Sequence, residues 1–443
     1  MIQARPVQGA WRRLRWAADA VLIAILLGIP WVRIGGEPLV WLDVPGRKFH
    51  VFGLVIFPQE LYFLWLILAG LALALFFFTA LAGRLWCGWA CPQTVFTDVF
   101  AAVARFVQGW KGTRPPRRLA PWRRAATHVI WLGLSAVVAF HLVGYFVPPP
   151  ELLARLRAGE LAGAAGGFLV VMTALTYLDF GLVRQTFCKY LCPYARFQGV
   201  LFDRDTLVVG YDVQRGEPRG KKGVTRGDCV DCGLCVQVCP TGIDIRDGLQ
   251  LECIACTQCI DACNGVMAKT GRPPDLIGYR SLAGLEGARR ARLLRPRVAL
   301  YGALMVAVGV AFVGLLSARN PMDLTVAHNR EALFGRAADG RLGNAFTLRL
   351  ENRERVDRAF RLRVEGTGRE GDGDDAFDLV AGMNPIQVAA ISTVEARVFV
   401  MAPSDYEAEG GRAPLRFVAE RVDDPTRHVV RRTQFLVPGA GGG

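Results

Sequence analysis

Eight of the 12 cysteines in this 443-residue chain form two runs with the same spacing. Each run reads C-x₂-C-x₂-C-x₃-C, and Pro240 follows the first one. Thiolates at this spacing hold iron–sulfur cubanes, and in two-cluster ferredoxins the fourth cysteine of each run ligates the other cluster. The sequence therefore predicts two [4Fe–4S] clusters, held by Cys229, Cys232, Cys235 and Cys263 and by Cys253, Cys256, Cys259 and Cys239.

Zinc is the alternative metal for these two runs. Structural zinc sites usually combine two separated C-x₂-C pairs, whereas each run here places four cysteines within eleven residues. The spacing therefore favours iron–sulfur clusters over zinc. Two neighbouring clusters predict a protein that moves single electrons.

The other four cysteines belong to an internal repeat. Residues 85–96 read LWCGWACPQTVF and residues 186–197 read TFCKYLCPYARF, so both contain aromatic-C-x₃-C-P-x₃-F. Cysteines four residues apart share one helix face, and soft thiolates select copper(I), zinc or iron–sulfur iron. A copper site, a third cluster, a dithiol–disulfide pair and plain buried packing all remain open. The four are Cys87, Cys91, Cys188 and Cys192.

Apolar segments must position these motifs, and five are long enough to cross a bilayer, which takes about 20 mostly apolar residues. They are Trp16–Val32, Leu61–Leu81, Ala125–Phe146, Ala162–Val183 and Val298–Leu316. Short loops rich in Lys and Arg face the cytoplasm, which predicts that the N-terminus and residues 84–124 and 184–297 lie there and that residues 317–443 lie on the other side. The Arg12-Arg13 pair could be a twin-arginine signal, but an uncleaved start anchor fits better because no cleavage site follows.

Composition supports a membrane protein. The chain is 52% hydrophobic and 21% charged, against typical values of about 45–50% and about 25%, which excludes a disordered chain. The net charge of +14 comes mainly from arginines beside apolar segments. We therefore expect membrane lipid as a partner and no nucleic acid. All cysteines lie on the predicted cytoplasmic side, where thiols stay reduced.

Several tryptophans, Trp11 among them, are predicted to lie at the membrane interface. Three other residues in or near the apolar segments are weaker candidates for a functional site. His128 and His141 could bind haem or copper, but their separation puts them at different angles around a helix, which favours packed histidines. Asp179 is a functional candidate because carboxylates are rare within membranes; a position at the interface is the equal alternative.

The C-terminal region has a different pattern. Short alternating segments separated by Gly, Asp and Asn predict a β-sandwich. These segments are Asn344–Leu350, Ala359–Val364, Val394–Val400, Leu415–Ala419 and Thr433–Val437, with a polar loop at Gly366–Asp375 and a frayed tail at Gly439–Gly443. Because no cluster of His, Cys or Met occurs here, we expect a docking or positioning module.

The fold class that follows is a membrane α-helical protein with a cytoplasmic α+β two-cluster ferredoxin and an all-β sandwich. Residues 1–183 form the membrane domain, built as two parallel repeats of a helix pair plus C-x₃-C-P. Residues 184–297 form the cytoplasmic segment, with its ferredoxin core at 225–270. Residues 298–316 form the fifth transmembrane helix, and residues 317–443 form the exported domain.

Four stretches resemble the CcoG/RdxA/FixG proteins, accessory proteins for cbb₃-type cytochrome c oxidase. They cover residues 30–59, 83–96, 192–220 and 227–263, and the segments FDRDTL and YDVQRGEPRG within 192–220 go beyond ferredoxin cysteine spacing. The resemblance implies a bacterial inner-membrane protein with an immunoglobulin-like periplasmic domain. It also implies reduction of copper(II) to copper(I), with the catalytic role at Cys87, Cys91, Cys188 and Cys192. The implied partners are copper chaperones or oxidase assembly factors.

Three functions are compatible with these features. The first is a cupric reductase fed by an unidentified cytoplasmic electron donor. The second is an electron-transfer module, similar to NapH polyferredoxins, between the quinol pool and a partner enzyme. The third is a redox-sensing regulator that acts through the exported domain.

Overall fold

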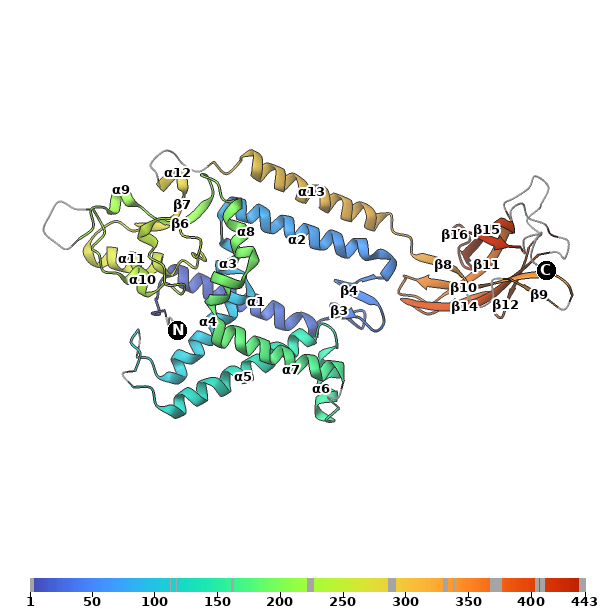
Figure 1. The fold of residues 1–443 in the computed structure, drawn as a ribbon, viewed down its shortest axis with the longest axis horizontal. Helices are drawn as coiled ribbons and strands as arrows, with labels where there is room; N and C mark the ends of the chain where they lie inside the picture. Colours follow the sequence, from blue (N-terminus) through green and yellow to red (C-terminus); the bar gives the residue numbers. More distant parts are fainter. Residues whose placement is uncertain are drawn as a thin grey trace. The chain divides into compact units, whose positions relative to one another are not determined.

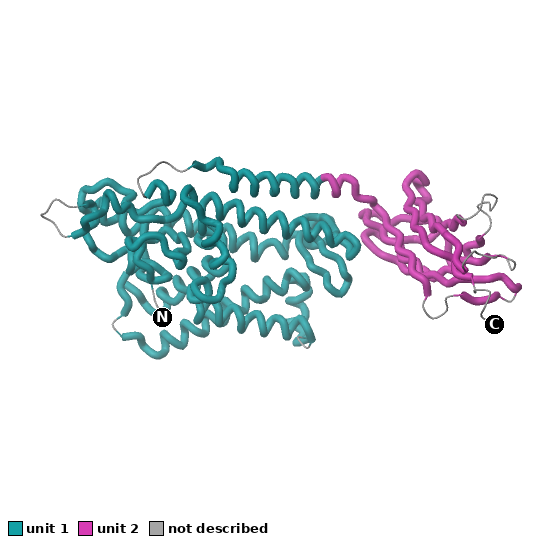
Figure 2. The backbone as a smooth tube through the Cα atoms, turned by 45° about the horizontal axis from the view of Figure 1, so that its top comes forward, with its two compact units in different colours: residues 1–313 teal, residues 314–443 magenta. Residues whose placement is uncertain are grey.

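The computed structural model forms two compact units, Met1–Val313 and Gly314–Gly443 (Figure 2). The structure describes residues 4–111, 113–116, 118–160, 163–220, 227–285, 292–329, 334–337, 339–366, 377–402, 406 and 411–437. Residues 367–375 of the predicted polar loop, the predicted tail and Ala162 at the start of the fourth predicted span lie outside these ranges.

Five helices of the described residues are long and apolar enough to cross a membrane. They are α1 (Ala10–Gly28, with a 3₁₀ turn at Ile29–Trp31), α2 (Leu61–Ala82), α5 (Pro121–Val143), α7 (Ala164–Thr176, with a π-helical continuation at Tyr177–Val183) and α13 (Pro296–Ser317). These helices indicate a membrane protein. The first begins at Ala10 rather than at the predicted Trp16, because its arginine-rich first turns continue the same helix.

Two of the long helices, α2 and α13, lie side by side (Figure 1). The rings of Phe63 and Phe312 meet edge to face with centroids 5.6 Å apart. Farther along, Gly302 leaves room for Phe77, whose ring carbon would lie 3.4 Å from a Cβ at that position. Aromatic rings against small residues thus hold the fifth apolar helix on the second.

The remaining long helices surround α4 (Pro92–Gln108), which follows the first C-x₃-C-P motif. Phe96 and Phe100 of α4 are buried against Phe180 and against Trp131 of α5. The fourth apolar segment departs from the predicted regular helix, because its backbone widens into π-helix at Tyr177–Val183 and again at Phe187–Leu191. π-helical turns often occur at functional sites, and the second one contains a cysteine of the repeat.

Short elements between the long helices were not predicted. The connection between α1 and α2 holds the pair β1 (Arg33–Ile34) and β2 (Glu37–Pro38) and a small antiparallel sheet of β3 (Val40–Asp43), β4 (Lys48–Val51) and β5 (Leu54–Ile56). A short helix, α6 (Pro149–Arg157), follows α5. Gly35 and Gly36, with φ of 62° and 89°, supply the left-handed turn between β1 and β2.

The second unit consists of two antiparallel sheets. One has the order β12-β14-β10-β8 with β9 on β10, and the other has the order β13-β11-β15-β16. The strands are β8 (Met322–His328), β9 (Gly335–Arg336), β10 (Leu342–Asn352), β11 (Arg358–Gly366), β12 (Asp378–Ala381), β13 (Ile386–Val388), β14 (Ser392–Ala402), β15 (Arg412–Arg421) and β16 (His428–Leu436). Phe346 of one sheet and Phe417 of the other are fully buried with centroids 5.1 Å apart, so the sheets share one apolar core.

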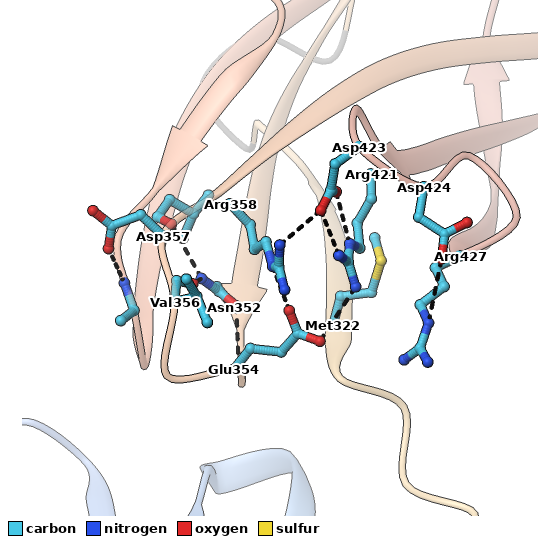
Figure 3. A network of polar contacts seen from close by, with 12 residues as sticks. Met322, Asn352, Glu354, Val356, Asp357, Arg358, Arg421, Asp423, Asp424 and Arg427 are labelled. Atoms are coloured by element: carbon cyan, nitrogen blue, oxygen red, sulfur yellow. Dashed lines mark hydrogen bonds and ion pairs between the residues drawn. The ribbon is translucent and has the colours of Figure 1, made fainter. Parts of the chain in front are cut away.

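Ion pairs join two loops of this unit (Figure 3). Arg358 and Arg421 each bind both Glu354 and Asp423. The hydrogen bonds from Arg421 lower the pKa of Asp423 to about 2. The network ties the β10–β11 connection to the β15–β16 connection and therefore fixes the two loops relative to each other.

Candidate electron-transfer site

The ferredoxin segment is closed by two distant strands. β6 (Leu207–Tyr211) pairs antiparallel with β7 (Ile277–Ser281), and the short helices α10 (Leu234–Gln237) and α11 (Gln258–Thr270) lie between them in the chain. Two cavities in this segment are lined by cysteines and apolar side chains. One contains Cys229, Cys232, Cys235 and Cys263, and the other contains Cys239, Cys253, Cys256 and Cys259 together with Cys235.

This grouping is the crossed one expected from the spacing, because the fourth cysteine of each run lines the cavity of the other run. The loops that carry the two cysteine runs also have the same backbone conformation. Asp231 and Ala255, each just before the second cysteine, have φ of 52° and 54°, and Gly233 and Thr257, each just after it, have φ of 66° and 62°. Left-handed residues in such turns aim successive N–H groups into an anion-binding concavity, as in many iron–sulfur sites.

The thiols themselves fit a polynuclear cluster. Burial, reinforced by the neighbouring thiols, raises the pKa of Cys253 and of Cys263 to about 12. Thiolates crowded in an apolar cavity therefore need a compensating cation, which bound iron supplies. Over the described residues, no three His, Cys, Asp or Glu side chains converge as ligands of a single ion, whereas cysteines surrounding a cavity suit a cluster.

The two C-x₃-C-P motifs have matching local geometry. Cys91 and Cys192 each directly precede a proline at the first position of a helix, α4 and α8 (Pro193–Leu201) respectively, with φ of −69° and −72°. Four residues before the first cysteine of each motif, Gly83 and Arg184 have φ of 57° and 55°. Proline at this position starts a helix without losing a hydrogen bond, so each motif ends a turn and begins a helix.

The structure brings the four repeat thiols into one neighbourhood. Burial, and then the charges of Cys91, Cys87 and Cys192, raises the pKa of Cys188 to about 12. Burial and the charge of Cys91 do the same for Cys87, whose Sγ lies 3.2 Å from Oε1 of Gln198. All four are free thiols. The four thiols are neighbours, but they do not form a ready-made site for a single ion. Within the described ranges, no three His, Cys, Asp or Glu side chains are arranged to hold one metal ion.

The repeat thiols contact the second ferredoxin loop. Buried Cys87 packs in one apolar cluster with Cys256 and Ile254, and Cys188 and Tyr194 pack against it. The approach is close at Gly88, where a Cβ would lie 2.5 Å from the carbonyl oxygen of Ala255. Only glycine permits this contact between the first C-x₃-C-P turn and the loop that carries Cys253 and Cys256.

Arg84 adds a positive charge at this contact. It is 5% exposed, comes from the turn before α3 (Leu85–Trp89), and donates a hydrogen bond to the carbonyl of Ala195 in α8. Burial raises the pKa values of Cys87 and Cys253, and the charge of Arg84 opposes both increases. The Arg84 guanidinium therefore favours the thiolate form of one cysteine in the C-x₃-C-P repeat and of one cysteine in the ferredoxin.

Sequence comparisons place these features in a known family. The chain is 39% identical over 448 residues to the protein RdxA of Cereibacter sphaeroides, covering 95% of this chain and 92% of RdxA. It is 34% identical over 493 residues to the nitrogen fixation protein FixG of Rhizobium meliloti, covering 98% of this chain and 92% of FixG.

The chain belongs to the RdxA/FixG family.

Family models agree with this assignment. Residues 183–282 match a 4Fe–4S dicluster domain, residues 63–111 match a 4Fe–4S binding domain, and residues 312–438 match the IG-like fold at the C-terminus of FixG, described as a putative oxidoreductase. The ferredoxin-type protein NapH of Haemophilus influenzae is 27% identical over 209 residues, covering 45% of this chain and 66% of NapH. This member of the RdxA/FixG family is therefore an iron–sulfur electron-transfer protein.

Sequence reasoning missed the role of the N-terminal arginines, which it treated only as charges flanking a span. Arg12 and Arg15 lie on one face of α1 and bind Asp98 of α4 at 2.8 and 2.7 Å. Arg15 also donates to the carbonyl of Cys256 at 3.1 Å. Burial disfavours ionisation of Asp98, but the two arginines outweigh it and hold its pKa below the usual value. No motif signals this pairing, because Asp98 is distant in sequence.

Trp11, which was predicted to lie at the membrane interface, packs against two other aromatic side chains. Its ring packs against Trp89 and Tyr279 with centroids 6.0 and 5.6 Å away. Trp89 donates to the hydroxyl of Tyr279 at 3.1 Å. Trp11 therefore joins the start of α1 to the first C-x₃-C-P turn and to the ferredoxin strand β7.

The weaker candidates have packing roles. Nδ1 of His128 lies 3.0 Å from the hydroxyl of Tyr177, and Nδ1 of His141 lies 2.8 Å from the carbonyl of Val137 in its own helix. Asp179 accepts a hydrogen bond of 2.9 Å from Gln93, which follows the first C-x₃-C-P motif. Asp179 thus contacts the region of the repeat thiols, whereas the two histidines do not.

Proposed function

We propose that this protein is a copper(II) reductase of the bacterial inner membrane. It takes electrons from a cytoplasmic donor and supplies copper(I) for assembly of a cbb₃-type cytochrome c oxidase. The observation that carries the proposal is the packing of Cys87 against Cys256 and Ile254. It connects the soft repeat thiols with the loop of a 4Fe–4S domain.

The residues of the chain have separate tasks in this reaction. The two bound clusters supply single-electron transfer, and we assign their ligands as the two crossed cysteine sets. Each copper(II) ion gains one electron and becomes copper(I), which soft thiolates prefer. Cys87, Cys91, Cys188 and Cys192 receive the metal, and their protons leave as thiolates bind it. Gly88 permits the close contact, and Arg84 favours the negative charge on either side of it.

The proposed topology follows the distribution of basic residues. The N-terminus, residues 84–124 and the ferredoxin core at 225–270 lie in the cytoplasm, and the all-β domain lies in the periplasm. The membrane domain consists of two parallel repeats, which the matching turns at Gly83 and Arg184 support. We propose that the exported domain docks copper chaperones or oxidase assembly factors.

The proposal is tested with anaerobic, detergent-purified protein. The protein is reduced, the reductant is removed, copper(II) is added, and copper(I) is followed with a chromogenic chelator. A variant with Cys87, Cys91, Cys188 and Cys192 changed to alanine is compared after its iron content has been matched to the parent. Loss of fast reduction with intact iron supports the proposal. Equal rates would mean that copper takes electrons without these thiols.

A second candidate is an electron-transfer module between the quinol pool and a partner enzyme. The similarity to NapH over 45% of the chain favours it. The two functions differ in what oxidises or reduces the protein. Reduction of the iron–sulfur absorbance by a soluble quinol, together with equal copper rates in the two proteins above, would favour this second function.

A further inference from the structure

A cavity of about 240 Å³ lies beside the ferredoxin segment and outside the thiol site. It is lined by the start of α1, by α4 and by the turn that follows the fourth apolar helix. Arg12, Arg105 and Arg184 all line it, whereas the described lining holds one carboxylate, Asp98. The cavity therefore has a surplus of positive charge.

The single carboxylate does not neutralise this surplus. Asp98 already binds Arg12 at 2.8 Å and Arg15 at 2.7 Å. Among the described residues, no ion pair or side-chain hydrogen bond is formed by Arg105 or Arg184. Arg184 is only 8% exposed, and its Nε is buried without a hydrogen-bond partner. A buried guanidinium nitrogen without a hydrogen-bond partner is costly to a fold.

Electrostatics agrees with this geometry. Burial lowers the pKa of Arg184, and burial together with the charge of Arg12 lowers that of Arg105; the charge of Asp98 opposes both decreases without overcoming them. Both shifts mean that the protein environment by itself disfavours these positive charges. A bound anion would restore the balance.

The backbone of Arg184 is also in a strained conformation. Its φ of 55° and ψ of −133° match those at Gly83, 57° and −120°, at the equivalent place before the first C-x₃-C-P motif. Glycine adopts this conformation freely, but a residue with a Cβ is strained there. The strained residue lines the cavity, and strained backbone often occurs at binding sites.

We propose that this cavity binds a phosphate-bearing anion through Arg184 and Arg105, with Arg12 completing the positive wall. Guanidinium groups bind phosphate oxygens through paired, charge-assisted hydrogen bonds. Trp16 and Trp110 also line the cavity, and the Arg12 guanidinium lies over the Trp16 ring, 4.7 Å from its centroid. The phosphate belongs either to an anionic lipid headgroup or to a soluble phosphate compound.

The ligand would lie next to the second ferredoxin cavity. Pro240 and Gln258 line the anion cavity, and they adjoin Cys239 and Cys259 in sequence. A bound phosphate would therefore link α1, α4 and the cluster-binding segment. This inference concerns binding and stability, and it does not depend on whether copper is the electron acceptor.

The test uses the full iron-loaded protein with two probes. The lipid probe is phosphatidylglycerol, compared with phosphatidylcholine in nanodiscs and followed by native mass spectrometry. The soluble probe is pyrophosphate, added to delipidated protein in neutral detergent and followed by calorimetry. The variants are Arg105→Gln, Arg184→Gly, which also relieves the strained backbone and so protects the fold, and their combination. The matched control is Arg124→Gln, at an exposed arginine of α5 outside the cavity lining.

We expect one probe to bind the parent and the control equally and to bind each single variant about tenfold more weakly, the loss typical of one charge-assisted contact. Selective retention of phosphatidylglycerol would identify a lipid headgroup as the source. Binding of pyrophosphate without lipid selectivity would identify a soluble compound. Binding of neither probe to the parent, or equal binding by parent and double variant at matched iron content, would overturn the proposal.

Discussion

The contact between the first C-x₃-C-P turn and the second ferredoxin loop gives a specific prediction at Gly88. In Gly88→Ala the new Cβ would lie 2.5 Å from the carbonyl oxygen of Ala255 and 2.7 Å from that of Ile254, whereas ordinary contacts begin at 3.4 Å. Both obstacles are backbone atoms, so the 253–257 loop must retreat by nearly one ångström. We expect the contact to open without loss of the cysteine ligands.

Two effects set the size of the change. Overpacking of this kind costs about 1–3 kcal/mol, and the higher helix propensity of alanine returns about 0.5–1 kcal/mol. We therefore expect a net destabilisation of up to about 2.5 kcal/mol. Displacement of a reacting group by about 1 Å can also slow a reaction by up to about 100-fold, so copper(I) formation should slow by more than the loss of stability explains.

The assay compares three proteins. The iron–sulfur absorbance is followed during heating, and the initial rate of copper(I) formation is measured at a temperature where all three are intact. Gly265→Ala is the matched control, because Gly265 lies within helix α11 of the ferredoxin and a Cβ added there would meet nothing within 4 Å. If Gly88→Ala kept both the thermal transition and the rate of this control, the loop would not be seated on the first C-x₃-C-P turn.

Three further changes test neighbouring parts of the site. Asp98→Asn leaves two buried arginines of α1 without their shared partner, which should cost about 3–5 kcal/mol and be seen as earlier thermal loss of iron–sulfur absorbance; a transition unchanged from the parent would contradict the pairing. Cys239→Ser and Cys263→Ser should each remove a different cluster from a total of about eight irons, and identical residual EPR spectra in the two variants would refute the crossed ligand sets. Arg84→Gln removes a positive charge near the second cluster site and should lower one reduction potential by on the order of tens of millivolts; equal potentials in variant and parent, measured by redox titration, would contradict that role.

The elements that depend on local pattern could be predicted from the sequence. Long apolar runs predicted the five long apolar helices, because the bilayer sets a minimum length for a span. Alternating segments such as Ala359–Val364 predicted strands of the all-β domain, although the strands extend further, as in β11 at Arg358–Gly366. Four strands of this domain, β8, β9, β12 and β13, were missed. Three of them have at most four residues, too few for alternation to be recognised.

The contacts between distant segments could not be predicted in the same way. Cysteine spacing predicted two crossed sets of thiols, and the members of each set line one cavity, whereas their ligation of clusters stays a prediction. The pairing of Arg15 with Asp98 and the seating of Gly88 on Ala255 depend on how separate segments pack. The charge of Arg184 was visible in the sequence, but its left-handed backbone was not, since only glycine signals such a conformation.

The most direct test of the central claim is a single-turnover measurement of how the iron–sulfur clusters lose their electrons. Fully reduced, anaerobic protein is mixed rapidly with copper(II), and the return of the oxidised iron–sulfur absorbance is followed together with copper(I) formation. We predict that both signals rise at one rate in the parent, with one copper(I) formed for each electron lost. Both should slow together when Cys87, Cys91, Cys188 and Cys192 are alanine and iron content is unchanged. Equal rates in the two proteins would contradict electron delivery through the repeat thiols.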